Sequence, residues 1–126
     1  LMQTPGISSV FPGSLVCYSN DVKMAELGVN PEIFEIHGAV SEACAKAMAE
    51  GVRTKFKTKL SIATTGIAGP GGGSEAKPVG LVYVAVSTET ECICKKFRLF
   101  GNREQIIQRS SNAALWMVKQ ALSIPL

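Results

Sequence analysis

Long apolar runs, aromatic residues and charged residues are all scarce in this sequence of 126 residues. No apolar run approaches the roughly eighteen residues that a membrane-spanning helix needs. Charged residues make up 18% of the chain and the formal net charge is +3, so no strong sequence-independent attraction to nucleic acid is built in. We therefore expect neither a membrane nor a nucleic acid among the partners of this protein.

The basic residues that are present gather in two short clusters. The first falls at the expected C-terminal end of a helix, where cations complement the helix dipole. The second falls on a strand, where it is typical of an exposed face. A nucleic-acid surface is the alternative interpretation. The members are Arg53, Lys55, Lys57 and Lys59 in the first cluster, and Lys95, Lys96 and Arg98 in the second.

Cysteine is also sparse, and its spacing excludes two kinds of site. Cys17, Cys44, Cys92 and Cys94 lack the paired two-residue gaps of a zinc site and are too few for a disulfide scaffold. Cys92 and Cys94 point to one face of a strand, where they are poorly placed to bridge each other. The first residues lack the charged and apolar regions of a secretion signal. We expect free thiols, no metal and a cytoplasmic location.

Residues 1–126 are 46% hydrophobic, which fits one compact domain. Strand and helix alternate first and a hairpin follows, so the pattern predicts an α/β sandwich with a mixed sheet. The expected strands are 13–18, 60–64, 81–86 and 92–100. The expected helices are 21–27 with Asn20 as its cap and Gly28 at its end, 31–36 opened by Pro31, a longer helix capped by Ser41, and a last helix whose start at Asn102 and Gln105 resembles a capping box.

The segment 66–74 is the richest in glycine. Glycines permit positive φ and close backbone approach, so successive N–H groups can converge on a phosphate or a carbonyl oxygen. A mobile surface loop is the alternative. The segment matches neither the P-loop, which needs Gly-Lys-Ser/Thr before a helix, nor the dinucleotide pattern, which needs a helix after the glycines.

Lys23 lies in the first turn of a helix that directly follows a predicted strand. The positive end of the helix dipole and partial burial both disfavour an ammonium ion, so Lys23 could act as a general base. An exposed lysine paired with Asp21 or Glu26 is the alternative. His37, the one histidine, is expected to be structural because His37-Gly38 closes a short helix.

Five blocks of this sequence occur in the same order as in the CinA C-terminal domain family, which this chain resembles over essentially its whole length. The blocks are Tyr18-Ser19-Asn20 with Lys23, residues 37–41, residues 65–70 with the glycines that follow, residues 77–83, and Gly101-Asn102-Arg103. The resemblance implies a three-layer α/β/α sandwich. It also implies a serine amidohydrolase that converts nicotinamide mononucleotide to nicotinate mononucleotide and ammonia, without a metal or a cofactor.

The resemblance also implies roles for individual residues. The family's lysine falls on Lys23 and its tyrosine on Tyr18, while Ser8 is the best counterpart of the family's Gly-Ser-Ser block. The backbone of the glycine segment would hold an oxyanion, and the arginines near the last helix would bind the phosphate of a nucleotide substrate. The implied substrate-binding residues are Ser19, Asn20, Thr64, Thr65, Gly66, Gly69, Gly71, Gly72, Arg103 and Arg109.

The sequence departs from the family in two places. Family members carry an acidic-Ser-Cys-Thr-Gly-Gly block, expected to hold the nucleophile, on a preceding strand and helix, and these 126 residues do not contain it. Ile107 also stands where relatives often have arginine. We therefore expect a domain incomplete at its N-terminus, with an unpaired sheet edge and exposed apolar surface that favour a homo-oligomer. The alternatives to a deamidase are a non-catalytic nucleotide-binding or regulatory module and an inactive fragment.

Overall fold

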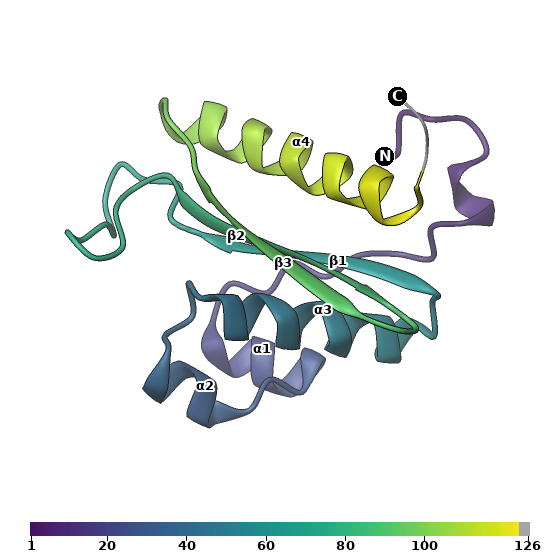
Figure 1. The fold of residues 1–126 in the computed structure, drawn as a ribbon, viewed down its shortest axis with the longest axis horizontal. Helices are drawn as coiled ribbons and strands as arrows, with labels where there is room; N and C mark the ends of the chain where they lie inside the picture. The colour runs from purple at the N-terminus through teal and green to yellow at the C-terminus, as the bar shows by residue number, and fades with distance from the viewer. Residues whose placement is uncertain (124–126) are drawn as a thin grey trace.

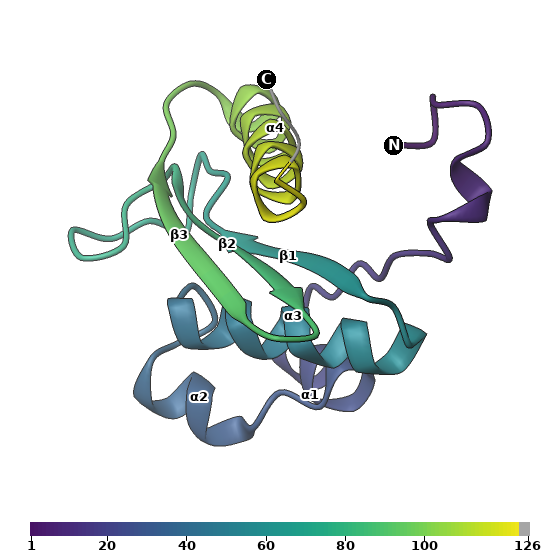
Figure 2. The ribbon, with the colours of Figure 1, turned by 45° about the vertical axis from the view of Figure 1, so that its right-hand side comes forward.

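A three-stranded sheet lies between two layers of helices in the computed structural model, which describes residues 1–123 (Figure 1). The elements are a short 3-10 helix η1 (Ile7–Ser9), α1 (Asn20–Leu27), α2 (Pro31–Ile36), α3 (Glu42–Phe56), β1 (Leu60–Gly66), β2 (Leu81–Thr88), β3 (Cys92–Arg98) and α4 (Arg103–Ala121). Helix α3 covers one face of the sheet, with α1 and α2 packed on its outer side, and α4 covers the other face (Figures 1 and 2). This agrees with the predicted α/β/α layers.

The sheet has the order β1-β2-β3, and both pairs of strands are antiparallel. The predicted mixed sheet is therefore wrong for the described residues. The cause is the segment 13–18, which was expected to be a strand but forms no regular secondary structure. Val16 and Tyr18 are 81% and 80% exposed, so the strand-forming residues there have no neighbouring strand to pair with. β1 has no partner on its outer side within residues 1–123, as expected for an unpaired edge.

The central strand β2 is buried on both faces, which explains its nearly continuous apolar run. Ala63 of β1 and Ala85 of β2 pack in one cluster with Cys44, Ala45 and Ala49 of α3. The opposite face packs against α4 through the residues Val82, Val84, Val86, Ile106, Ala114 and Met117. Each face of the sheet therefore has its own hydrophobic core.

Local capping signals set the ends of most helices as predicted. Ser41 caps α3 by accepting a hydrogen bond from Cys44 N at 3.1 Å, and Asn102 and Gln105 form a complete capping box on α4. The cap of α1 was predicted wrongly. Ser19, and not Asn20, accepts from Val22 N at 3.1 Å, because the backbone at Ser19 is extended and Asn20 is already helical.

The strand bounds differ slightly from the predicted ones. β1 continues to Gly66 and β2 to Thr88, so the polar turn of the hairpin is shorter than expected, and Thr88 N donates to Glu91 O at 2.8 Å. β3 ends at Arg98 rather than at residue 100. Among residues 1–123, no helix combines the length and the apolar character needed to cross a membrane.

Candidate active site

Lys23 is buried near the start of α1, with 6% of its surface exposed. Its Nζ donates a hydrogen bond to the backbone oxygen of Tyr18 at 2.9 Å. It makes no ion pair with Asp21 or Glu26 among the described residues, and Glu26 pairs instead with Lys55 at 3.0 Å. The structure therefore contradicts the alternative in which Lys23 is exposed and forms an ion pair with Asp21 or Glu26.

Lys23 opens into a groove of about 450 Å³ between the chain before α1, the end of β1 and the first half of α4. Apolar side chains form much of its wall, among them Leu15, Val16 and Ile107, and all three are exposed. This is the exposed apolar surface that the sequence predicts beside an unpaired edge. The groove lies between α1 and α4 beside the end of β1 from which the glycine-rich loop leaves.

The groove brings together six of the residues predicted for the site. The six are Tyr18, Lys23, Thr64, Thr65, Gly66 and Arg103. Thr64 is exposed, whereas Thr65 is buried and its Oγ1 donates to Ala39 O at 2.8 Å on the other face of the sheet. The Thr65 hydroxyl is thus engaged in holding β1 to the turn before α3.

The other predicted site residues do not line the groove. Ser8 is exposed in η1, within the N-terminal segment that lies to the side of both helix layers in Figures 1 and 2. Ser19 is occupied as the cap of α1, and the next residue, Asn20, is exposed at the helix start. Gly71 and Gly72 are exposed in the loop that projects from the sheet.

The two arginines predicted to bind phosphate are placed differently. Arg103 lines the groove, and its Nη1 donates to the backbone oxygen of Gly69 at 2.8 Å, which ties the glycine-rich loop to the start of α4. Gly69 has a φ of 79°, a conformation that favours glycine. Arg109 instead donates to the backbone oxygen of Phe100 and does not line the groove.

Sequence analysis missed Ser110 and Ser111, which line the groove from α4 beside Ile107. Their hydroxyls donate to the backbone oxygens of Ile106 and Ile107, at 2.7 Å and 3.2 Å. Positions 103, 107, 110 and 111 follow helical spacing, so they share a face of α4. The sequence contains this spacing, but the apolar face of the same helix predicts only packing against the sheet.

Charge near Lys23 affects one neighbouring thiol. Burial raises the pKa of the fully buried Cys44, while the positive charges of Lys23 and Lys77 oppose that rise. No group of three or more His, Cys, Asp or Glu side chains that could hold a metal ion occurs within residues 1–123. The arrangement offers an amine, backbone donors and a guanidinium, which are the parts of a site that moves a proton and binds an anion.

Comparison with known proteins identifies relatives of this chain. The family model of the CinA C-terminal domain matches residues 1–122 of this chain. A CinA-like protein of Acidobacterium capsulatum is 48% identical over 118 residues, covering 94% of this chain and 28% of that protein. A putative competence-damage inducible protein of Caldanaerobacter subterraneus is 48% identical over 122 residues, covering 97% of this chain and 30% of that protein. The chain thus spans less than a third of the length of these curated relatives.

Solved structures agree with this fold. The competence damage-inducible protein A of Klebsiella pneumoniae has a TM-score of 0.93 at 26% identity, covering 99% of this chain and 78% of that one. The competence/damage inducible protein of Agrobacterium tumefaciens has a TM-score of 0.77 at 39% identity, covering 80% of this chain and 62% of that one.

Proposed function

Because the chain belongs to the CinA C-terminal domain family, we propose that its groove serves a metal-independent amidohydrolase that converts nicotinamide mononucleotide to nicotinate mononucleotide and ammonia. The observation that carries this proposal is Lys23, a buried amine that opens into a groove and has no carboxylate partner among the described residues. A lysine in such a place can serve as a base once its amine is neutral.

On this proposal, Lys23 takes the proton of a serine hydroxyl, and the serine oxygen attacks the carboxamide carbon. The contact between Lys23 Nζ and Tyr18 O fixes where the amine lies. Among the described residues, Lys23 Nζ contacts Tyr18 O and no serine hydroxyl, so the proposal requires a serine that is brought to Lys23 in the active protein. Lys23 then gives that serine proton to the amide nitrogen, the C–N bond breaks and ammonia leaves, and water hydrolyses the acyl-enzyme to the carboxylate and the free serine.

The outer edge of β1 supplies donors for the oxyanion. Since β1 pairs only with β2 among the described residues, alternate N–H groups of β1 point outward, and the end of the strand at Thr64, Thr65 and Gly66 lies in the groove. Backbone donors held in place in this way stabilise negative charge as it develops on the carbonyl oxygen.

Arg103 and the apolar wall bind the rest of the substrate. One guanidinium nitrogen of Arg103 contacts Gly69 O, which leaves further N–H donors for a phosphate. Leu15, Val16 and Ile107 provide the apolar surface that a pyridine ring and a ribose can cover.

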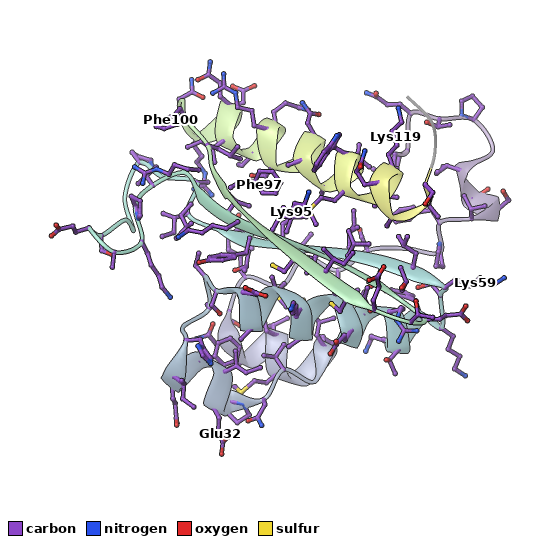
Figure 3. All side chains as sticks on the ribbon, in the orientation of Figure 1. Glu32, Lys59, Lys95, Phe97, Phe100 and Lys119 are labelled. Atoms are coloured by element: carbon purple, nitrogen blue, oxygen red, sulfur yellow. The ribbon has the colours of Figure 1, made fainter. Side chains whose placement is uncertain are left out.

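The proposal is tested by measuring ammonia release from nicotinamide mononucleotide with the full-length protein. We expect Lys23→Met to lower kcat by about a hundredfold or more, the range typical of losing a general base. Lys59→Met is the matched control, because Lys59 is exposed at the start of β1 and points away from the molecule (Figure 3). Undiminished turnover in Lys23→Met would refute the role of Lys23.

A second candidate is a non-catalytic module that binds a mononucleotide. It is favoured by one observation, namely that the Lys23 amine contacts a backbone oxygen and no serine hydroxyl among the described residues. This candidate predicts that nicotinamide mononucleotide raises the melting temperature of the full-length protein while no ammonia appears. Ammonia release that depends on Lys23 would exclude it.

A further inference from the structure

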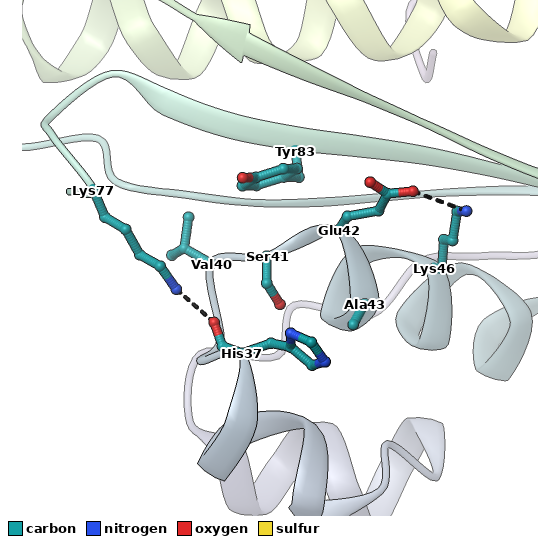
Figure 4. Close-up of a pocket in the computed structure, with 8 residues that line it drawn as sticks. All are labelled: His37, Val40, Ser41, Glu42, Ala43, Lys46, Lys77 and Tyr83. Atoms are coloured by element: carbon teal, nitrogen blue, oxygen red, sulfur yellow. Dashed lines mark hydrogen bonds and ion pairs between the residues drawn. The ribbon is translucent and has the colours of Figure 1, made fainter.

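A second hollow, of about 520 Å³, lies on the α3 face of the sheet and shares no residue with the groove. Its walls come from the end of α2, the start of α3, the glycine-rich loop and β2 (Figure 4). The residues that line it are His37, Val40, Ser41, Glu42, Ala43, Lys46, Lys77 and Tyr83. The function proposed above uses none of them.

Lys77 is held at the rim of this hollow. Its Nζ donates to the backbone oxygen of His37 at 2.5 Å, and a Cβ on Gly38 would lie 2.8 Å from the same nitrogen. The backbone of Lys77 is fixed by two hydrogen bonds with Ser74, from Ser74 N to Lys77 O at 2.8 Å and from Lys77 N to Ser74 Oγ at 3.0 Å. These hydrogen bonds therefore hold the Lys77 ammonium in one position at the rim of the hollow.

The charge of Lys77 is not neutralised by an acid. No carboxylate lies within ion-pair distance of it among residues 1–123, whereas Lys46, across the hollow, is paired with Glu42 at 2.9 Å (Figure 4). An ammonium has three donors, and one neutral carbonyl uses a single donor of Lys77. The free charge in this hollow is therefore positive and lies on the Lys77 side.

An aromatic ring and two small apolar side chains form part of the remaining wall, beside the polar His37 and Ser41. Tyr83 is partly buried on β2 and presents its ring to the hollow, Val40 comes from the turn before α3, and Ala43 comes from the first turn of α3. Figure 4 shows the hydroxyl end of Tyr83 on the side where Lys77 lies. An aromatic ring beside a cation accommodates a planar group that carries an anion.

We propose that this hollow binds a small organic anion, namely a carboxylate or a phosphate monoester attached to a planar apolar group. The ammonium of Lys77 contacts the anion with a charge-assisted hydrogen bond, and Tyr83, Val40 and Ala43 contact the planar group. Phenyl phosphate and benzoate carry these features, and inorganic phosphate carries the anion alone.

The test is a titration of the isotopically labelled protein with each of the three probes, followed by the backbone amide signals in NMR spectra. We expect saturable shifts at Val40, Ala43 and Lys77 with phenyl phosphate or benzoate, and affinity at least about tenfold weaker for inorganic phosphate. Lys77→Met should weaken phenyl phosphate binding about tenfold or more, while the control Lys59→Met leaves it unchanged.

A second variant distinguishes loss of the binding site from a change in the loop that carries Lys77. Ala43→Met fills the hollow without changing any charge, and it should also abolish the shifts while the spectrum of the remaining protein is retained. The proposal is overturned if Lys77→Met binds phenyl phosphate as well as the parent protein does. Equal affinity for inorganic phosphate, or shifts confined to the groove residues Val16 and Thr64, would overturn it as well.

Discussion

The two faces of the sheet are covered unequally, and the difference bears on access to the groove. On the α3 face, α3 packs on the sheet and is itself backed by α1 and α2, and Cys44, Ala45 and Ala49 are fully buried. On the other face, α4 alone covers the sheet, and Ile107 and Trp116 of this helix are 49% and 43% exposed. The groove that receives Lys23 is bounded on one side by this single helix. The partly exposed α4 therefore leaves the groove accessible.

Polar groups follow the same division. On the α3 face, side chains are used to join elements: Ser61 Oγ donates to Ala49 O at 2.6 Å and Arg53 Nε donates to Ser87 Oγ at 3.0 Å. On the α4 face, Lys95 of β3 lies 4.5 Å from the ring centroid of the half-exposed Trp116, an arrangement that solvent can reach. On the α3 face these side chains thus hold elements together, whereas the Lys95–Trp116 pair on the α4 face lies at the surface.

Two adjacent isoleucines of α4 test this division most strongly. Ile106 is 2% exposed and packs against β2, so Ile106→Ala should lower the free energy of unfolding by about 2–5 kcal/mol. Ile107 is half exposed in the groove wall, so Ile107→Ala should cost less than about 1 kcal/mol. Urea denaturation measures both. Equal losses would mean that the groove is not open in solution.

Much of the fold could be predicted because its signals are local. The Ser41 cap, the Asn102–Gln105 capping box and Pro31 at the start of α2 each act within one helical turn. The prediction of a strand at 13–18 was wrong, because a β-strand forms only where another strand pairs with it, and residues 13–18 have no such partner among the described residues. The mixed sheet failed for the same reason, since it depended on that segment.

The site was predicted only in part. Lys23 and Tyr18 are close in sequence, so their proximity follows from a single helix start. Gly71 and Gly72 were assigned to the site because glycine permits unusual backbone, but composition does not say where a loop goes. Ser110 and Ser111 reach the groove only because α4 lies across β1, a contact between residues far apart in sequence.

Gly51 of α3 tests how tightly the covered face is packed. A Cβ at this position would lie 2.0 Å from the backbone oxygen of Leu27, at the end of α1. Gly51→Ala should therefore cost about 1–3 kcal/mol, although alanine is the better helix former. Gly71→Ala is the matched control, because nothing lies within 4 Å of its added Cβ, and it should change stability by less than about 0.5 kcal/mol. A neutral Gly51→Ala would show that α1 can move away from α3.

Cys94 of β3 provides the smallest and most local test of how closely the α3 face is covered. Its side chain packs against the core of the α3 face, and burial, followed by the negative charge of Glu42, raises the pKa of this thiol from 9.0 to about 11. Because the folded state holds the thiol proton more tightly than the unfolded state does, this contribution to stability is complete below pH 9. It declines as the pH rises from 9 to about 11.

The rate of Cys94 alkylation by iodoacetamide should accordingly be half-maximal near pH 11, because the thiolate is the reactive form. Mass spectrometry of the modified peptide follows this cysteine separately from the other three. Glu42→Gln removes the neighbouring negative charge and should move the rise to lower pH, even though burial is retained. If alkylation of the parent protein is half-maximal at pH 9 instead, water reaches Cys94 beside β3. The α3 face would then be more open to solvent than the structure shows.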